Sequence, residues 1–234
     1  MVWREHGHMT TSCPPNPDPE ALLHDVLASG WLRLILPEAL GGEGASAADV
    51  AKALLPLARR HPAMGWMAWS QALVIEALVR SPNVAVRETV LPDLLDGSRA
   101  GAVSWAPEFG LASPPRPVAA TPLARGWRLD GCLEQVFNLQ WMGYVVLCPV
   151  WFAATPGRPP QLSWTLLRSE EDGLHAEMSP QGHLRRQAAC GDLHLRGVYF
   201  REDELLADDA VALRTPLSVL DQALRAALWS AALT

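Results

Sequence analysis

The sequence of 234 residues contains very little lysine. Lys52 is the single lysine among 19 basic residues, and no stretch has more than two adjacent basic residues. Acidic residues are in excess, so the formal net charge is −6 at pH 7. Nucleic-acid-binding surfaces need clustered positive charge to neutralise phosphates. The sequence therefore argues against nucleic acid as a partner.

Long hydrophobic runs are also missing. The longest one, residues 142–155 (MGYVVLCPVWFAAT), is shorter than a membrane span and is interrupted by Pro149. The N-terminal segment is polar and rich in proline, and it lacks the apolar core of a signal peptide. We expect no association with a membrane and a cytoplasmic location.

Sequence motifs of metal sites and disulfide frameworks are absent. The four cysteines are Cys13, Cys132, Cys148 and Cys190, each at least sixteen residues from the next. The seven histidines show no ligand spacing, and no serine lies in a GxSxG sequence. We therefore predict reduced thiols, no metal centre and no serine hydrolase.

The first hundred residues have the pattern of a helical domain. Hydrophobic residues make up 49% of the chain, and four segments carry them at helical spacing: residues 18–30, 46–58, 63–80 and 83–95. Asp18, Ser46 and Asn83 have the residue types of N-caps. The third segment is apolar on most sides, which predicts a buried helix.

After Gly97 the pattern becomes that of β-strands. The predicted strands are residues 102–105, 118–121, 126–131, 145–150, 162–167 and 193–198. The third of these is expected to stop at the glycine turn of Gly131. Turn residues recur about every ten positions, as in an antiparallel sandwich or barrel.

A last amphipathic helix is expected from Thr215 onwards. Its apolar face consists of Leu217, Leu220, Leu224 and Leu228. Such a face needs a partner to cover it, which predicts oligomerisation.

The predicted fold class is therefore α+β, with four segments in chain order. They are a flexible tail (1–17), an all-α domain (18–100), an antiparallel β-sandwich or barrel domain (101–213) and the first helix of a C-terminal helical domain (214–234).

Four sequence segments resemble motifs of the acyl-CoA dehydrogenase superfamily, and they occur in the same order. Residues 30–44 (GWLRLILPEALGGEG) resemble its N-terminal Pro-Glu and Gly-Gly loop, and residues 126–131 resemble a glycine-flanked hairpin of its middle domain. Residues 136–138, followed by 143–146, stand where the superfamily has its Trp-Ile-Thr-Asn segment. Residues 193–206 resemble the strand that leads into the C-terminal bundle.

The resemblance implies a flavin-dependent oxidoreductase that acts on the CH–CH bond of an acyl thioester. The implied cofactor is FAD, with FMN as an alternative, and the implied partners are an acyl-CoA-type molecule and further acyl-CoA dehydrogenase-like chains in a homo- or hetero-oligomer. The residues matching the cofactor-binding motifs are Trp105, Pro107, Gly110, Gln135, Val136, Phe137 and Asn138. Those matching substrate-binding positions are Trp66, Trp69 and Leu111.

The sequence departs from the motifs of the superfamily at several of these positions. Trp105 replaces a threonine and Leu111 a serine, while Gln135 stands for the tryptophan that shields the flavin and Phe137 for the threonine beside N5. Main-chain N–H groups remain as donors to the ring. No residue of the chain matches the catalytic glutamate, so no catalytic residue is assigned.

Three functions therefore stay open. They are an acyl-CoA dehydrogenase-like oxidoreductase that is incomplete or needs a partner chain, a flavin monooxygenase of the same fold, and a non-catalytic scaffold subunit. Residues 63–66 (AMGW) resemble a Ser-x-Gly-Trp pattern of the monooxygenases. Trp66 and Trp69 also fit ordinary core packing, and the cofactor-motif residues also fit ordinary turns of a β domain.

Overall fold

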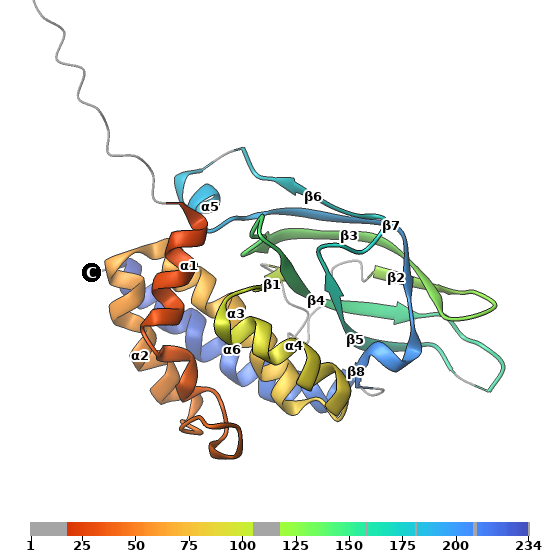
Figure 1. Ribbon diagram of the computed structural model, residues 1–234, viewed down its shortest axis with the longest axis horizontal. Helices are drawn as coiled ribbons and strands as arrows, with labels where there is room; N and C mark the ends of the chain where they lie inside the picture. The colour runs from red at the N-terminus through yellow and green to blue at the C-terminus, as the bar shows by residue number, and fades with distance from the viewer. Residues whose placement is uncertain (1–17, 105–117, 158, 181, 208–209, 234) are drawn as a thin grey trace, which may run out of the picture.

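The computed structural model describes residues 18–104, 118–157, 159–180, 182–207 and 210–233, without the side chains of residues 210 and 211 (Figure 1). The predicted tail, residues 1–17, lies outside the described residues. The described helices are α1 (Pro19–Ala28), α2 (Ala47–Arg60), α3 (Pro62–Arg80), α4 (Val84–Asp96), α5 (His183–Gln187) and α6 (Ala210–Ala232). The strands are β1 (Ala100–Ser104), β2 (Val118–Pro122), β3 (Trp127–Phe137), β4 (Tyr144–Phe152), β5 (Gln161–Arg168), β6 (Leu174–Met178), β7 (Gly191–Phe200) and β8 (Leu205–Ala207).

The N-terminal helices begin at the predicted cap residues. The Asp18 carboxylate accepts a hydrogen bond from the Glu20 N–H at 3.3 Å, and Ser46 Oγ accepts one from the Asp49 N–H at 3.2 Å. Asn83 Oδ1 accepts from the Val86 N–H at 3.2 Å. These bonds satisfy N–H groups that the first helical turn leaves unpaired, so all three predicted helix starts are confirmed.

Helix α3 is the centre of the helical layer. Every residue from Ala63 to Leu78 is buried, and the helix contacts α1, α2, α4, α6 and β1. A Cβ atom on Gly65 would lie 2.6 Å from Leu228 of α6 and 2.9 Å from Ala58 of α2. The missing side chain lets three helices approach closely, and the prediction of a buried helix is confirmed.

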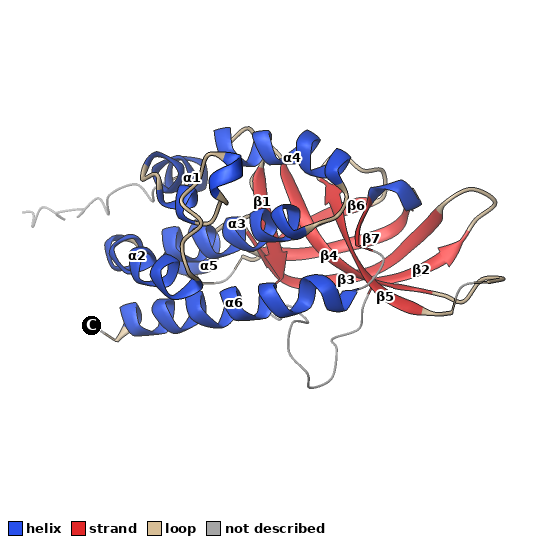
Figure 2. Ribbon diagram, turned by 90° about the horizontal axis from the view of Figure 1, so that it is seen from below, coloured by secondary structure: helices blue, strands red, loops and turns tan. Residues whose placement is uncertain are grey.

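The strands form one curved sheet beside the helices (Figure 2). The strand order is β6-β7-β3-β1-β4-β5-β8, and β2 pairs with both β3 and β4. The predicted α+β fold class is confirmed, but the sheet is not purely antiparallel as expected, because β1 and β2 both run parallel to β4. The chain passes through other strands before it returns beside β1, which gives the long crossover that a parallel pair requires.

Two predicted element bounds are also wrong. Strand β3 does not stop at Gly131, where a Cβ atom would lie only 3.1 Å from Cα of Val118. That glycine permits close approach of β2 and makes no turn. Helix α6 begins at Ala210, before Pro216, because Leu213 and Leu217 are both buried and hold the early turns against the core.

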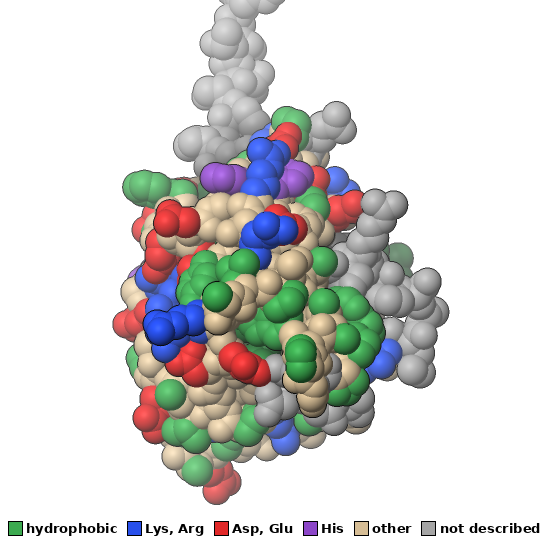
Figure 3. Space-filling model, turned by 90° about the vertical axis from the view of Figure 1, so that its right-hand side faces the viewer, with side chains coloured by type: hydrophobic (Ala, Val, Ile, Leu, Met, Phe, Trp, Pro, Cys, Tyr) green, Lys and Arg blue, Asp and Glu red, His purple; other side chains and the backbone are tan. Residues whose placement is uncertain are grey.

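The apolar face of α6 is covered by the chain itself. Its leucines at positions 217, 220, 224 and 228 are at most 5% exposed, and the helix packs on α2 and α3. The predicted reason for oligomerisation is therefore wrong, and oligomerisation stays a prediction without that support. At the far end of the sheet, where Leu123, Trp151 and Tyr199 are exposed, apolar and charged side chains are mixed (Figure 3).

Buried hydrogen bonds join α3 to the sheet. Gln71 Oε1 accepts from the Gly101 N–H at 2.6 Å and from Asn138 Nδ2 at 3.2 Å, while Gln71 Nε2 donates to the Leu94 carbonyl at 2.7 Å. Ser70 Oγ donates to the Gly101 carbonyl at 2.9 Å. Gln71 and Asn138 have no exposed surface, so these polar groups depend on one another.

Replacing Gln71 by leucine should destabilise the protein. The variant Gln71→Leu keeps the side-chain volume but leaves the Gly101 N–H and the Leu94 carbonyl buried without a partner. We expect the free energy of unfolding, measured by urea titration, to fall by about 3 kcal/mol. The control Gln222→Leu, at an exposed position of α6, should change it by less than about 0.5 kcal/mol. Equal losses in both variants would contradict this structural role.

A second polar connection lies at the surface, between the turn before β1 and the end of β5. Arg99 Nη1 donates to Glu170 Oε2 at 2.7 Å, and Arg99 Nε donates to Asp93 at 3.2 Å. The hydrogen bonds from Arg99 lower the pKa of Glu170 from 4.5 to about 2. The ionised carboxylate therefore stabilises the folded state above pH 4.5, and this contribution is lost as the pH falls through 2.

The variant Glu170→Gln should reveal this pH dependence. Because both partners are partly exposed, we expect a loss of only about 1 kcal/mol in the free energy of unfolding at pH 7. The difference from the parent chain should shrink as the pH falls from 4.5 towards 2. Burial raises the pKa of the neighbouring Glu171, so Glu171→Gln should cause no loss at pH 7. A pH-independent effect of Glu170→Gln would refute the assignment of this stabilisation to the ionised Glu170 carboxylate.

Candidate functional site

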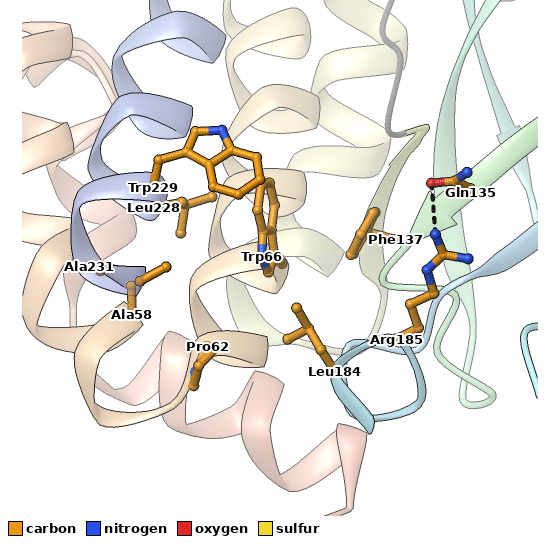
Figure 4. Close-up of a pocket in the computed structure, with 11 residues that line it drawn as sticks. Ala58, Pro62, Trp66, Gln135, Phe137, Leu184, Arg185, Leu228, Trp229 and Ala231 are labelled. Carbon is orange, nitrogen blue, oxygen red and sulfur yellow. Dashed lines mark hydrogen bonds between the residues drawn. The ribbon is translucent and has the colours of Figure 1, made fainter. Parts of the chain in front are cut away.

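A cavity of about 370 Å³ lies where the helices meet the sheet. It is bounded by the first turns of α3, the last turns of α6, the end of β3 and the short helix α5 (Figure 4). The lining residues are Ala58, Pro62, Trp66, Gln135, Phe137, Leu184, Arg185, Leu228, Trp229, Ala231 and Ala232. Most of these side chains are apolar, as in sites that bind small organic molecules.

Three aromatic rings form the walls of this cavity. The Trp66 ring lies 5.5 Å from the Phe137 ring at an angle of 32°, and 6.2 Å from the Trp229 ring at 79°. Trp66 and Phe137 are buried, whereas Trp229 is 56% exposed. Tilted and edge-on rings of this kind offer faces on which a further planar group can stack.

The cavity brings together three of the residues that the sequence assigned to cofactor and substrate. Gln135 and Phe137 share one face of β3, and Trp66 projects towards them from α3. Val136 does not line the cavity, because successive residues of a strand point to opposite faces. Asn138 does not line it either, since its amide is used in the bonds to Gln71 and Gly101.

Trp69 is part of the core. It is fully buried, and its Nε1 donates to Asp221 Oδ1 of α6 at 2.7 Å. Arg225 Nε donates to the same oxygen at 2.7 Å, and its guanidinium lies 4.6 Å from the centre of the Trp69 ring. These contacts attach α6 to α3 one turn away from the cavity. Trp105, Pro107, Gly110 and Leu111 lie outside the described residues.

Sequence reasoning missed the residues that α5 and α6 contribute. Leu184 and Arg185 lie on a helix of five residues, which is too short for a periodic pattern to reveal. Trp229 lies beside the predicted leucine face, and only the packing of α6 on α3 shows that it meets Trp66. The signal in the sequence that could have identified Trp229 is the position of an aromatic residue next to an apolar helical face.

The backbone beside the cavity is held in unusual conformations. Gln135, Asn138 and Ala189 have φ values of 50°, 68° and 46°, and they are the only non-glycine residues with positive φ in the described part of the chain. The N–H groups of Asn138 and Leu139 donate to the carbonyls of Ala188 and Ala189 at 3.0 and 2.9 Å. Such strain accumulates at functional sites, where it fixes side-chain positions.

The cavity has little charge. No carboxylate or imidazole is among its lining residues in the described part of the chain, and Arg185 is their one charged side chain. Arg185 Nη2 donates to Gln135 Oε1 over 3.4 Å. The same part of the chain has no cluster of His, Cys, Asp or Glu that could hold a metal ion.

The described residues fit the apolar part of a flavin ring better than its hydrogen-bonding edge. The aromatic walls can stack on a planar ring. However, the Gln135 N–H already donates to Asp192 Oδ1 at 2.8 Å, and those of Asn138 and Leu139 donate to carbonyls after α5. The polar groups left at the cavity are the Gln135 amide and the Arg185 guanidinium. The other predicted cofactor segment, around residues 105–110, is not described.

Comparisons with known proteins agree with this architecture. Residues 12–98 match the sequence model of the acyl-CoA dehydrogenase N-terminal domain family. The structure of PigA with FAD and proline is 16% identical, with a TM-score of 0.72 over 92% of this chain and 57% of that chain. Dibenzothiophene monooxygenase (TdsC) from Paenibacillus sp. A11-2 is 18% identical, with a TM-score of 0.70 over 92% of this chain and 55% of that chain.

Glutaryl-CoA dehydrogenase from Mycobacterium smegmatis is 17% identical, with a TM-score of 0.68 over 85% of this chain and 50% of that chain. No curated protein sequence matches the chain. The chain has the acyl-CoA dehydrogenase fold. Its residues 12–98 match the N-terminal domain family of the acyl-CoA dehydrogenases, in agreement with the resemblance of its motifs.

The chain spans 50% to 57% of the length of these three structures. Within the described residues, no helix combines the length and the hydropathy that a membrane span requires.

Proposed function

We propose that this chain contributes to a flavin-dependent oxidoreductase of the acyl-CoA dehydrogenase type, with FAD as the cofactor. One observation carries the proposal. Residues assigned separately to the cofactor (Gln135 and Phe137) and to the substrate (Trp66) line a single cavity. A redox site needs its cofactor and its substrate in contact. In this cavity the residues assigned to the two ligands are close enough for such contact.

The residues of the cavity have distinct roles in this proposal. Phe137 and Trp66 stack on planar groups and exclude water from the reacting region. Trp229, which is more exposed, covers the cavity from α6. FAD, when bound, supplies the acceptor for a hydride. The described lining supplies no general base, so a dehydrogenase reaction needs a carboxylate from outside these residues.

A flavin monooxygenase of the same fold is the second candidate. The observation that favours it is the combination of aromatic walls with a lining that has no carboxylate among the described residues. An aromatic substrate fits such walls by stacking, and its oxidation by reduced flavin and oxygen does not require a base that abstracts a proton next to a thioester. A non-catalytic scaffold subunit is the third candidate, and loss of flavin binding would distinguish it.

The proposal also covers the substrate, the location and the oligomeric state of the protein. We take its substrate to be an acyl-CoA-type molecule, and the protein to act in the cytoplasm as an oligomer with itself or with a related chain.

Flavin retention tests the proposal directly. The purified chain, loaded with FAD and freed of excess, should keep the visible absorption band of bound flavin. Removing one stacking ring by Phe137→Ala should weaken FAD binding about fivefold, since an aromatic contact contributes about 1 kcal/mol. The matched control is Trp141→Phe, because Trp141 is 86% exposed and does not line the cavity. Its affinity for FAD should be unchanged.

The loaded protein then separates the three functions. Bleaching of the flavin band by an acyl-CoA without oxygen supports the dehydrogenase. Oxygen-dependent hydroxylation of an aromatic compound with reduced flavin supports the monooxygenase. A folded, colourless protein after the loading step contradicts both and supports the scaffold subunit.

A further inference from the structure

The rim of the aromatic cavity carries the positively charged side chain of Arg185. Arg185 is exposed, and no carboxylate of the described residues lies within 4 Å of its guanidinium. Its one hydrogen bond within the described part of the chain, to Gln135 Oε1, is long at 3.4 Å. A guanidinium can donate up to five hydrogen bonds in a planar fork that matches an oxyanion. Most of this donor capacity is unused.

Three acidic side chains, those of Glu134, Glu177 and Asp192, line a smaller hollow together with Arg185. Asp192 accepts from the Gln135 N–H at 2.8 Å, and Glu177 lies 3.5 Å from His194 Nε2. Arg185 therefore lines both this acidic hollow and the aromatic cavity, and it forms no ion pair within 4 Å with any described residue.

A second polar group near the rim also lacks a partner. His61 joins α2 to α3 and precedes Pro62, which lines the cavity. Its Nδ1 is buried without a hydrogen-bond partner among the described residues. The charge of His183, which precedes the lining residue Leu184, acts on the His61 ring and, after burial, helps to lower its pKa. His61 and His183 thus neighbour the lining residues Pro62 and Leu184 in sequence, but neither histidine lines the cavity itself.

We propose that the cavity binds a molecule with a planar or acyl apolar body and one anionic group, held by Arg185. The apolar body lies between Trp66, Phe137 and Trp229. The oxyanion, a carboxylate or a phosphate, lies at the guanidinium. This inference names the class of ligand for the site proposed above and rests on that proposal for its role as substrate.

Two fluorescent probes that share an apolar ring system test the charge requirement. Anilinonaphthalene sulfonate carries an anion, and phenylnaphthylamine is its neutral counterpart. The unmodified chain should bind the anionic probe more tightly than the neutral one. In Arg185→Gln the dissociation constant of the anionic probe should rise about tenfold, while that of the neutral probe should stay within about twofold. Displacement by naphthoate and by naphthyl phosphate then shows which oxyanion is preferred.

Arg186→Gln is the matched control. Arg186 is the next residue, its Nη1 donates to the Pro180 carbonyl at 3.2 Å, and it does not line the cavity. It should leave both dissociation constants unchanged, and Arg185→Lys should recover part of the affinity for the anion. Urea titration of each variant shows whether the fold is intact.

The proposal is overturned by an equal effect of Arg185→Gln on both probes, or by an effect of Arg186→Gln as large as that of Arg185→Gln. Neither probe needs flavin, so this test is independent of the proposed function. If the unmodified chain does not retain FAD but Arg185→Gln selectively weakens binding of the anionic probe, the flavin-dependent function is contradicted and the anion site is supported.

Discussion

The hydrogen bonds around Gln71 are the interaction on which the site depends most. They attach the buried helix α3 to β1 and to the end of β3, inside a core that offers no water as an alternative partner. Trp66 lies just over one turn before Gln71, and Phe137 directly precedes Asn138. The same bonds therefore set the position of the Trp66 ring relative to the Phe137 ring, and with it the width of the cavity.

Two further attachments complete the walls. The hydrogen bond between Trp69 and Asp221 holds α6 against α3, which brings Trp229 to the cavity. The carbonyls of Ala188 and Ala189 accept hydrogen bonds from the turn after β3 and hold α5 beside it. Three separate pieces of the chain thus meet at one place, each through buried polar contacts that leave little freedom to the apolar side chains.

The chemistry of the site follows from what these attachments bring together. Aromatic rings and one guanidinium are well suited to bind and orient a ligand that has an apolar body and an anionic end. They are poorly suited to move a proton, because none of the lining groups of the described residues is a base near neutral pH. Binding and exclusion of water are the contributions of these residues, and acid–base chemistry has to come from elsewhere.

Local signals predicted much of the fold. N-cap residues, apolar periodicity and β-rich runs act within a few residues, so the helix starts, the buried character of α3 and most strands could be predicted from the sequence. The acyl-CoA dehydrogenase fold could be predicted as well, because the motifs that resemble that superfamily stand in order along the chain. The short elements β6, α5 and β8 were missed, since β6 buries only its first residue, α5 is mostly polar and β8 has only three residues.

The sequence by itself determined which segments are helices and strands, and which residues resemble a flavin-binding motif. The tertiary structure alone decided that Trp66, Phe137 and Trp229 share one cavity, that Trp69 and Asn138 do not line it, and that Arg185 stands at its rim. The reason is physical. These residues are far apart in the chain, and only the buried bonds of Gln71 and Asp221 and the packing of α6 on α2 and α3 bring them together.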